Sequence, residues 1–219
     1  MSKVFIVGGA GKVARRLAQQ LTQCGHQVLA LHRHPQQNEP LQALGATPVL
    51  GSLLELDASD LGRMMNGCDV VVFAAGAGGK GGMEMTDAID GHGLELAVAA
   101  AREAGVPRFV LVSAFPDAAR GKDVSETFEN YMAVKKRSDV HLAESDLDWV
   151  ILRPGTLVDT PGTGKVRCGL AIPYGEVARD DVAAVLLAII ERPTISRVII
   201  ELTQGHTPVS ESIDPFART

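Results

Sequence analysis

The sequence predicts an α/β fold built on a doubly wound, mostly parallel sheet of about seven strands, with a small C-terminal cap. Strand-like and helix-like segments alternate along the chain, which favours parallel strands joined by right-handed crossovers. The apolar strand at residues 3–7 runs directly into a glycine-spaced turn that opens a helix. The strand predicted at residues 69–74 carries apolar side chains in succession from residue 70 onward, as expected of a strand that helices cover on both faces.

The expected elements follow this alternation from one end of the chain to the other. Strands are predicted at residues 3–7, 27–31, 47–50, 69–74, 108–112, 149–152 and 197–202. Helices are predicted at residues 15–24, 58–65, 86–104, 128–144 and 179–191. No linker or repeat divides the chain, so residues 1–219 are expected to form one Rossmann-like domain, with residues 156–219 contributing the cap.

The composition excludes several classes of function. The 219 residues are 46% hydrophobic, which is enough for the core of one domain. A net charge of −5 without a basic run, together with one Trp and two Tyr, argues against nucleic acid as the partner. The longest apolar run, residues 182–190, is too short to cross a membrane. The three cysteines are widely spaced, so neither a disulfide framework nor a zinc site is indicated.

The remaining expectations concern location and partners. The first strand begins at residue 3, which leaves no room for a signal peptide, and a reducing cytoplasm fits best. Four histidines (26, 92, 141 and 206) are scattered without ligands at metal-binding spacing, so no metal is expected. We expect a monomer or homodimer whose partner is a small molecule.

The glycine-spaced turn after the first strand is predicted to bind a dinucleotide. Gly8 lets the chain turn with a positive φ, and Gly11 lets the backbone approach a phosphate without a Cβ in the way. The helix N-terminus that follows offers unpaired N–H groups to an anion. The spacing alone also fits an ordinary tight turn, but its place between the first strand and the first helix favours pyrophosphate binding. The candidate residues are Gly8, Gly9, Ala10, Gly11, Lys12 and Val13.

Other candidate residues lie where the later strands end. In a doubly wound sheet, ligands bind beyond the carboxyl ends of the strands, near the point where the strand order reverses. The residues at these strand ends are Arg33, Ser52, Leu53, Ala74, Ala75, Gly76, Ser113, Pro154 and Gly155.

Arg33 bears on the choice between the two nicotinamide cofactors. An Asp or Glu at this strand end would bind the ribose hydroxyls of NAD, but no acidic residue follows until Glu39. An arginine can instead pair with a 2′-phosphate, and Lys12 is a candidate for a second cation. The alternative is a solvated arginine in a polar loop. The missing carboxylate favours NADP.

Tyr131 and Lys135 are the candidate catalytic pair. Their spacing of four places a phenol and an ammonium on one face of a helix. A nearby ammonium lowers the pKa of a phenol, so Tyr131 would act as an acid or base near neutral pH. Lys135 would also reach the ribose hydroxyls of a bound nicotinamide nucleotide. The alternative is a solvent-facing amphipathic helix, because Lys136 and Arg137 make this surface basic.

Taken in order, these segments resemble the atypical short-chain dehydrogenase/reductase superfamily, in particular its small single-domain NAD(P)H-binding members. The resemblance covers nearly the whole chain and rests on residues 8–14, Arg33, Asp90-Gly91, 109–113, 131–135, 152–155 and 179–183. It implies NADP bound across the strand ends, with Tyr131 and Lys135 in the active site. It also implies that the backbone of residues 154–156 lies beside the nicotinamide carboxamide.

Three departures from the family's pattern limit this comparison. The family's hydroxyl donor usually lies one residue beyond the first serine after the fifth strand; here that residue is Ala114, and Ser113 is the remaining candidate. The Gly-Asp-Leu that commonly ends the third strand is Gly51-Ser52-Leu53, so a contact with the adenine amino group would be weaker or made by serine. No Asp-Glu pair follows Ala114, which argues against a sugar dehydratase.

Three functions therefore remain open. The first is an NADPH-dependent reductase of a small carbonyl, quinone or flavin-type acceptor, in which the cofactor supplies the hydride. A non-catalytic NADP(H)-sensing protein is favoured by Ala114 and by the small cap. A sugar epimerase would need a larger substrate region. The glycine-rich loop at residues 76–82 is either a flexible connection or a mobile flap whose Lys80 reaches an anion.

Overall fold

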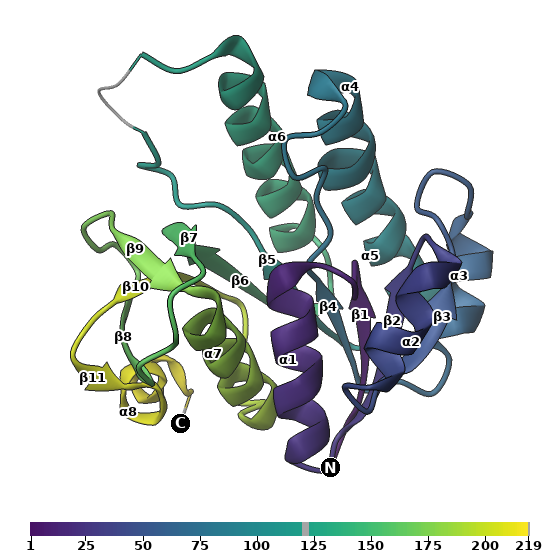
Figure 1. Cartoon of the computed structure of the whole chain (residues 1–219), viewed down its shortest axis with the longest axis horizontal. Coiled ribbons are helices and arrows are strands. Elements are labelled where there is room, and N and C mark those ends of the chain that lie inside the picture. Colours follow the sequence, from purple (N-terminus) through teal and green to yellow (C-terminus); the bar gives the residue numbers. More distant parts are fainter. Residues whose placement is uncertain (120–122, 219) are drawn as a thin grey trace.

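The computed structural model describes residues 1–119 and 123–218, and its centre is a sheet with helices on both faces (Figure 1). Within this part of the chain, seven strands run parallel in the order β3-β2-β1-β4-β5-β6-β10. They are β1 (Lys3–Val7), β2 (Gln27–His32), β3 (Thr47–Leu50), β4 (Val70–Phe73), β5 (Arg108–Val112), β6 (Asp148–Pro154) and β10 (Val198–Gln204). The strand order reverses at β1, which lies between β2 and β4. The predicted fold class and these seven predicted strands are confirmed.

Further strands extend the sheet beyond β10. The strand β8 (Lys165–Gly169) pairs antiparallel with β10, and β11 (Thr207–Pro208) pairs antiparallel with β8. Nearby, β7 (Thr156–Val158) and β9 (Glu176–Ala178) form a separate parallel pair. The sequence did not predict these four strands, because they are only two to five residues long and lack an apolar run.

The helices cover the sheet in two layers. They are α1 (Lys12–Gln23), α2 (Asn38–Gln42), α3 (Ala58–Met65), α4 (Gly82–Thr86), α5 (Gly93–Glu103), α6 (Glu126–Ala143), α7 (Arg179–Glu191) and α8 (Val209–Ile213). Val4 and Ile6 of β1 pack with α1 and α7 on one face, while Phe5 and Val7 pack with α3 and α5 on the other. This burial on both sides explains why the central strands read as continuous apolar runs.

The long helix predicted at residues 86–104 begins earlier and contains an irregular turn. α4 passes into a π-helical turn at Asp87–His92, which continues directly into α5. A π-helical turn is wider than an α-helical one and often marks a functional site. In this chain the turn places Asp90 at a cavity at the end of the sheet.

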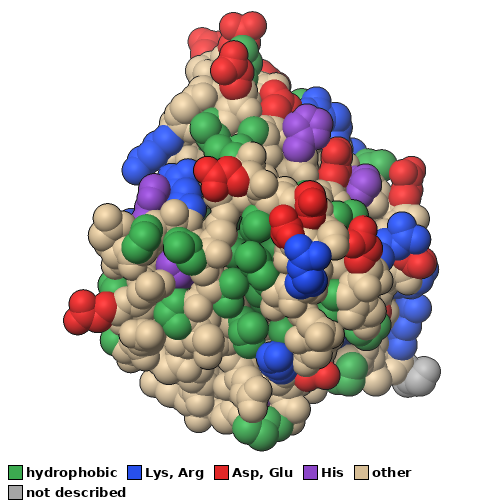
Figure 2. Space-filling view, turned by 90° about the vertical axis from the view of Figure 1, so that its right-hand side faces the viewer, with side chains coloured by type: hydrophobic (Ala, Val, Ile, Leu, Met, Phe, Trp, Pro, Cys, Tyr) green, Lys and Arg blue, Asp and Glu red, His purple; other side chains and the backbone are tan. Residues whose placement is uncertain are grey.

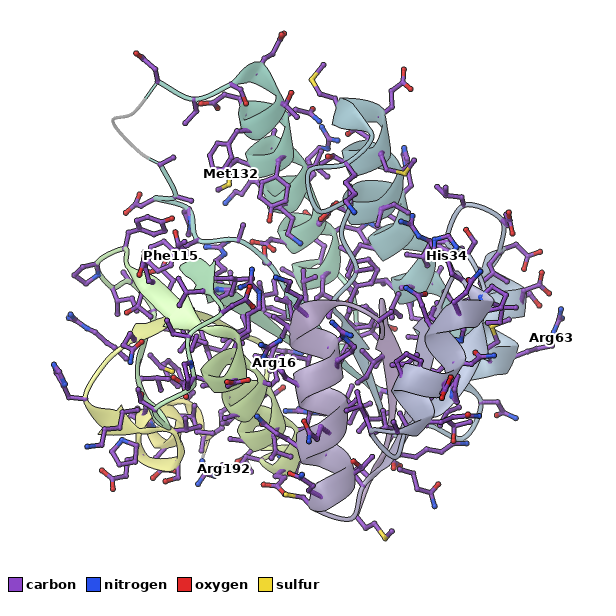
Figure 3. The ribbon with its side chains drawn as sticks, in the orientation of Figure 1. Arg16, His34, Arg63, Phe115, Met132 and Arg192 are labelled. Atoms are coloured by element: carbon purple, nitrogen blue, oxygen red, sulfur yellow. The ribbon has the colours of Figure 1, made fainter. Side chains whose placement is uncertain are left out.

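The segment after β6 mostly joins the main layers. α7 packs beside α1, and β10 is part of the parallel sheet. Of residues 156–218, only Leu157 and Arg179 line the cavity described below. Phe115, which follows β5, lies beside this segment and packs edge-on against Tyr174 with ring centroids 5.4 Å apart (Figure 3).

The side of the molecule at β3 is shown in Figure 2. Hydrophobic side chains form a band across the middle of this face, and charged side chains lie around it. Leu50 at the end of β3 and the nearby Leu54 are each 52% exposed. Separately, none of the helices in the described residues is long and apolar enough to cross a bilayer.

Candidate cofactor and active site

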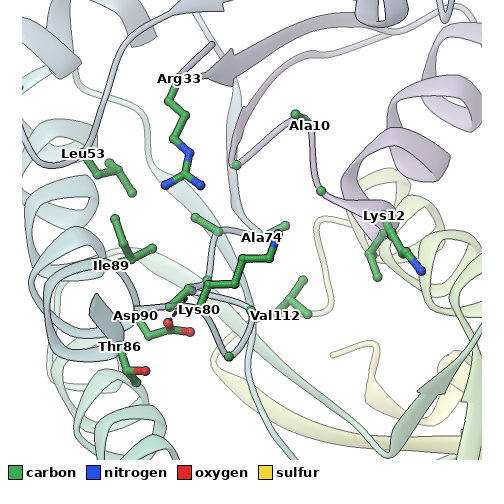
Figure 4. A pocket seen from close by; sticks show the side chains of 18 of the residues that line it. Ala10, Lys12, Arg33, Leu53, Ala74, Lys80, Thr86, Ile89, Asp90 and Val112 are labelled. Atoms are coloured by element: carbon green, nitrogen blue, oxygen red, sulfur yellow. Dashed lines mark hydrogen bonds between the residues drawn. The ribbon is translucent and has the colours of Figure 1, made fainter. Parts of the chain in front are cut away.

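A cavity of about 990 Å³ lies along the carboxyl ends of β2, β1, β4 and β5 (Figure 4). Its volume is at the upper end of the range for ligand pockets, which suits a molecule as large as a dinucleotide. The predicted site residues that line it are Gly8, Ala10, Gly11, Lys12, Val13, Arg33, Ser52, Leu53, Ala74, Ala75, Gly76, Ser113, Tyr131 and Lys135. The folded chain therefore brings most of the predicted residues to one wall.

The glycine turn forms the middle of this wall. Gly8 has a φ of +81°, and a Cβ there would lie 2.6 Å from the Cα of Ala75, so only glycine fits. Gly11 is the N-cap of α1, and its N–H donates to the carbonyl oxygen of Gly8 over 2.9 Å. The first turn of α1 contains no acidic residue, so no carboxylate of the same helix competes with a ligand for its free N–H groups. This arrangement suits a phosphate.

Three predicted cofactor residues do not line the cavity. Gly9 packs on β2, where a Cβ would lie 2.6 Å from the Cβ of Ala30, and its N–H donates to the carbonyl of Leu31 over 2.8 Å. Pro154 and Gly155 are buried at the end of β6. A Cβ on Gly155 would lie 2.0 Å from the carbonyl oxygen of Gly175. Gly9 and Gly155 are therefore needed for packing, because a side chain at either position would clash with the neighbouring chain.

Arg33 and Lys12 differ sharply in their surroundings. Arg33 is exposed, and its guanidinium points into the cavity (Figure 4). No residue in the described part of the chain forms an ion pair or side-chain hydrogen bond with it. Lys12 instead donates to Asp159 over 2.6 Å. The predicted second cation for a 2′-phosphate is therefore already paired, which sequence reasoning did not anticipate.

Asp159 is the centre of a cluster of charges beside the glycine turn. Its carboxylate lies 3.0 Å from Arg179 and 3.7 Å from Arg16, in addition to Lys12. The hydrogen bond from Lys12 and the charge of Arg179 hold the pKa of Asp159 below its usual value. Arg16 also binds Asp180 over 2.6 Å and lies between α1 and α7 (Figure 3). The cluster joins the chain after β7 to both of these helices.

Lys135 is buried, and its ammonium has two partners. Its Nζ donates to the carbonyl oxygen of Val112 at the end of β5 over 3.0 Å and lies 3.7 Å from Oδ1 of Asp90. The residue is 4% exposed. Burial lowers the pKa of Lys135, and the carboxylates of Asp90 and Asp139 offset part of this shift.

The prediction that Lys135 lowers the pKa of Tyr131 is wrong. Burial, followed by the charges of Asp90 and Asp139, raises the pKa of Tyr131 to about 12. The ammonium of Lys135 is held by Val112 and Asp90, so it does not offset these effects. Tyr131 is therefore a neutral phenol over the ordinary pH range, suited to donating a proton and not to abstracting one.

Ser113 lies at the cavity, but its hydroxyl is enclosed. The residue is 6% exposed, and its backbone N–H donates to the carbonyl of Leu152 over 2.8 Å. The Oγ atom is buried without a hydrogen-bond partner in the described residues. A buried hydroxyl without a partner is costly and often marks a functional position.

Several wall residues were missed by sequence reasoning. Thr86, Ile89, Thr127 and Phe128 all line the cavity, and the ring of Phe128 lies 6.1 Å from that of Tyr131. Asp90 appeared in the sequence only as part of the family resemblance. No local pattern distinguishes it from Asp87 and Glu95 in the same helical segment, so its burial could not be read from the sequence. Among the described residues, no group of three or more His, Cys, Asp and Glu side chains could hold a metal.

Fold and site together define an NAD(P)-binding protein of the short-chain dehydrogenase/reductase type. A family model described as NAD(P)H-binding matches residues 8–193, and the chain belongs to this family. The family groups it with oxidoreductases of the short-chain dehydrogenase/reductase kind.

Individual relatives carry different names. The Bacillus subtilis protein named "uncharacterized sugar epimerase YhfK" is 34% identical, over 96% of this chain and 98% of its own. A Bacillus halodurans structure provisionally assigned as an NAD-dependent epimerase/dehydratase has a TM-score of 0.90 at 30% identity and covers 98% of this chain and 100% of its own. A Stigmatella aurantiaca 4-hydroxy-2-methyl-3-oxo-4-farnesyl-3,4-dihydroquinoline-1-oxide ketoreductase is 34% identical over 61% of this chain and 40% of its own.

Proposed function

We propose that this chain is an NADPH-dependent reductase of a small carbonyl, quinone or flavin-type acceptor. The observation that carries the proposal is the order of the groups along the cavity. Arg33 follows β2, the glycine turn follows β1, and Lys135 reaches the end of β5 on the far side of β4. Three strand spacings separate β2 from β5, which is roughly 14 Å.

This order matches the order of groups in an extended dinucleotide. Arg33 would bind the 2′-phosphate, and the N–H groups at the start of α1 would bind the pyrophosphate. Lys135 would contact the nicotinamide ribose beside β5. NADPH, when bound, supplies the hydride, and Tyr131 then gives its phenolic proton to the oxygen of a reduced carbonyl.

A panel of carbonyl, quinone and flavin acceptors tests the proposal, with the oxidation of NADPH as the readout. For carbonyl acceptors, Tyr131→Phe is expected to lower turnover by about 10²–10⁴-fold while leaving the affinity for NADPH nearly unchanged. Tyr174→Phe is the matched control, because Tyr174 does not line the cavity. Equal rates for wild type and Tyr131→Phe across all accepted carbonyls would exclude Tyr131 as the proton donor.

A sugar epimerase is the second candidate, favoured by the names of the Bacillus relatives. Epimerisation through transient oxidation would interconvert two sugars without net consumption of NADPH. Incubation of nucleotide sugars with the protein and catalytic amounts of NADP, followed by chromatography of the epimers, distinguishes it from the reductase. A chain that binds NADP(H) but turns over neither class of substrate would instead fit the sensor hypothesis.

A further inference from the structure

Asp90 is a buried carboxylate for which the proposed reaction has so far no role. It lies in the π-helical turn between α4 and α5, is 2% exposed and borders the cavity (Figure 4). Each of its two carboxylate oxygens contacts a different part of the site.

The first contact is with the candidate catalytic lysine. Oδ1 of Asp90 lies 3.7 Å from Nζ of Lys135. Two other acidic side chains near this position are engaged elsewhere: Asp139 binds Arg153 over 2.7 Å, and Asp87 binds Arg137 over 2.6 Å. A buried ammonium needs a nearby negative charge, and Asp90 supplies it to Lys135.

The second contact is with the glycine-rich loop. Oδ2 of Asp90 accepts a hydrogen bond from the backbone N–H of Ala77 over 2.9 Å. Farther along, the tip of the loop has few contacts, because a Cβ added at Gly78 or Gly79 would meet no atom within 4 Å. The bond to Asp90 therefore holds the start of a loop whose tip has few contacts.

The position of Asp90 is itself set by α6. The backbone carbonyl oxygen of Asp90 accepts a hydrogen bond from Oγ of Ser138 over 2.7 Å. Ser138 lies one turn beyond Lys135, on the same face of α6. Two residues of α6 thus hold Asp90: Ser138 binds its backbone carbonyl oxygen, and Lys135 pairs with its carboxylate.

We propose that Asp90 is a positioning residue that joins the glycine-rich loop to the Tyr131–Lys135 pair. One carboxylate oxygen keeps the Lys135 ammonium at the end of β5, and the other keeps Ala77 at the cavity wall. The catalytic meaning of this link rests on the proposed function, but the link itself does not. Loss of the Asp90 carboxylate would therefore both free the loop and change the charge around Tyr131.

Limited digestion with trypsin measures the loop contact, because Lys80 lies in the loop. Asp90→Ala is expected to speed cleavage after Lys80 by about ten- to hundredfold, as the loss of a charge-assisted hydrogen bond predicts. Asp90→Asn retains an oxygen for Ala77 but not the charge, so it should speed cleavage by less than Asp90→Ala does. Asp87→Ala, which removes an ion pair from the same turn, is the control. Mass spectrometry of fragments that begin at Gly81 follows the reaction.

The effect of the Asp90 charge on the Tyr131–Lys135 pair is measured through the ionisation of Tyr131. Besides Asp90, the titratable groups around Tyr131 are Lys135 and Asp139 on α6, and Arg153 of β6 neutralises Asp139. A Tyr174→Phe background leaves Tyr131 as the only tyrosine, so tyrosinate absorbance reports it alone. Asp90→Asn should shift this titration to lower pH, whereas Asp87→Ala should not.

A second variant keeps both arms interpretable if Asp90→Ala fails to fold. Ala77→Pro removes the N–H donor from the loop and leaves the Asp90–Lys135 pair, so it should speed cleavage without moving the Tyr131 titration. Wild-type cleavage in Ala77→Pro, or an unshifted titration in Asp90→Asn, would overturn the proposal. If the chain reduces no acceptor, the proposed function fails while these two results stand.

Discussion

The charged side chains that line the cavity include some that are already paired and some that are free, and Arg33 is the free one at the end of β2. Lys135 is held by Val112 and Asp90, and Lys12 is held by Asp159. Arg33 has no such partner among the described residues, although it lies on the same cavity wall. A free guanidinium in this position is available to bind a phosphate through two parallel hydrogen bonds.

Arg33 is therefore expected to set the preference for NADP(H) over NAD(H). Arg33→Ala should weaken NADP binding by about ten- to hundredfold, the worth of one charge-assisted hydrogen bond, and leave NAD binding unchanged. Arg63→Ala, at an exposed arginine that pairs with Asp60 on α3, is the control. Isothermal titration calorimetry measures both affinities. Equal affinity of the wild-type protein for the two cofactors would refute the assignment.

The raised pKa of Tyr131 has a consequence for stability. The pKa in the folded protein is about 12, against an ordinary value of 10. Folding thus favours the protonated phenol, and this contribution is complete below pH 10 and is lost as the pH rises toward 12. At about pH 11, the free energy of unfolding of wild type should have fallen by about 1 kcal/mol relative to Tyr131→Phe. Urea unfolding at a series of pH values measures the difference, and parallel pH profiles would contradict it.

At the scale of elements, the glycine turn meets two separate demands. Gly11 opens α1 toward the cavity, and a Cβ there would lie 3.2 Å from the carbonyl oxygen of Gly8. Gly9 faces the other way and packs on β2. One motif therefore carries a binding position and a packing position, and substitutions distinguish them.

Gly11→Val is expected to abolish NADP binding while costing about 1 kcal/mol of stability, because its side chain takes the place of the phosphate. Gly9→Ala should instead cost about 1–3 kcal/mol through overpacking against Ala30. Calorimetric titration gives the first quantity and thermal unfolding the second. A Gly11→Val protein that is folded and binds NADP normally would show that the turn does not hold the pyrophosphate.

At the scale of the whole molecule, Arg108 joins the sheet to the end of α7. It is 5% exposed and binds Asp148 over 2.7 Å. It also donates to the carbonyl oxygens of Ile189 and Ile195, each over 2.9 Å. These bonds connect β5 and β6 to the chain that leads into β10. Removing the guanidinium would leave buried acceptors without donors.

Arg108→Ala is expected to lower the free energy of unfolding by about 3 kcal/mol, since it breaks a buried ion pair and its backbone bonds. Arg102→Ala is the matched control, because Arg102 pairs with Asp146 on the surface. That change should cost less than about 1 kcal/mol. Denaturant unfolding of the two variants compares them, and equal losses would show that Arg108 is not a structural link.

Much of the fold was predictable from local patterns. The strand Thr47–Leu50 and the helices Ala58–Met65 and Arg179–Glu191 have the predicted bounds. Each is an apolar run or an amphipathic segment with clear start and stop signals. The strands β8 and β11 were missed because short strands near the edge of a sheet need no apolar run, and the pairing of β8 with β10 and of β11 with β8 depends on the folded chain.

The sequence by itself determined the layers and the general place of the site, because periodicity and glycine spacing are local properties that survive in every context. Only the tertiary structure decided how the charged groups are paired. Lys12 pairs with Asp159, which is 147 positions away, and Asp90 of the π-helical turn pairs with Lys135 of α6. The pKa of Tyr131 rises because folding buries the phenol beside two carboxylates. Burial and contacts between distant residues arise only when the layers assemble, so no pattern along the chain records them.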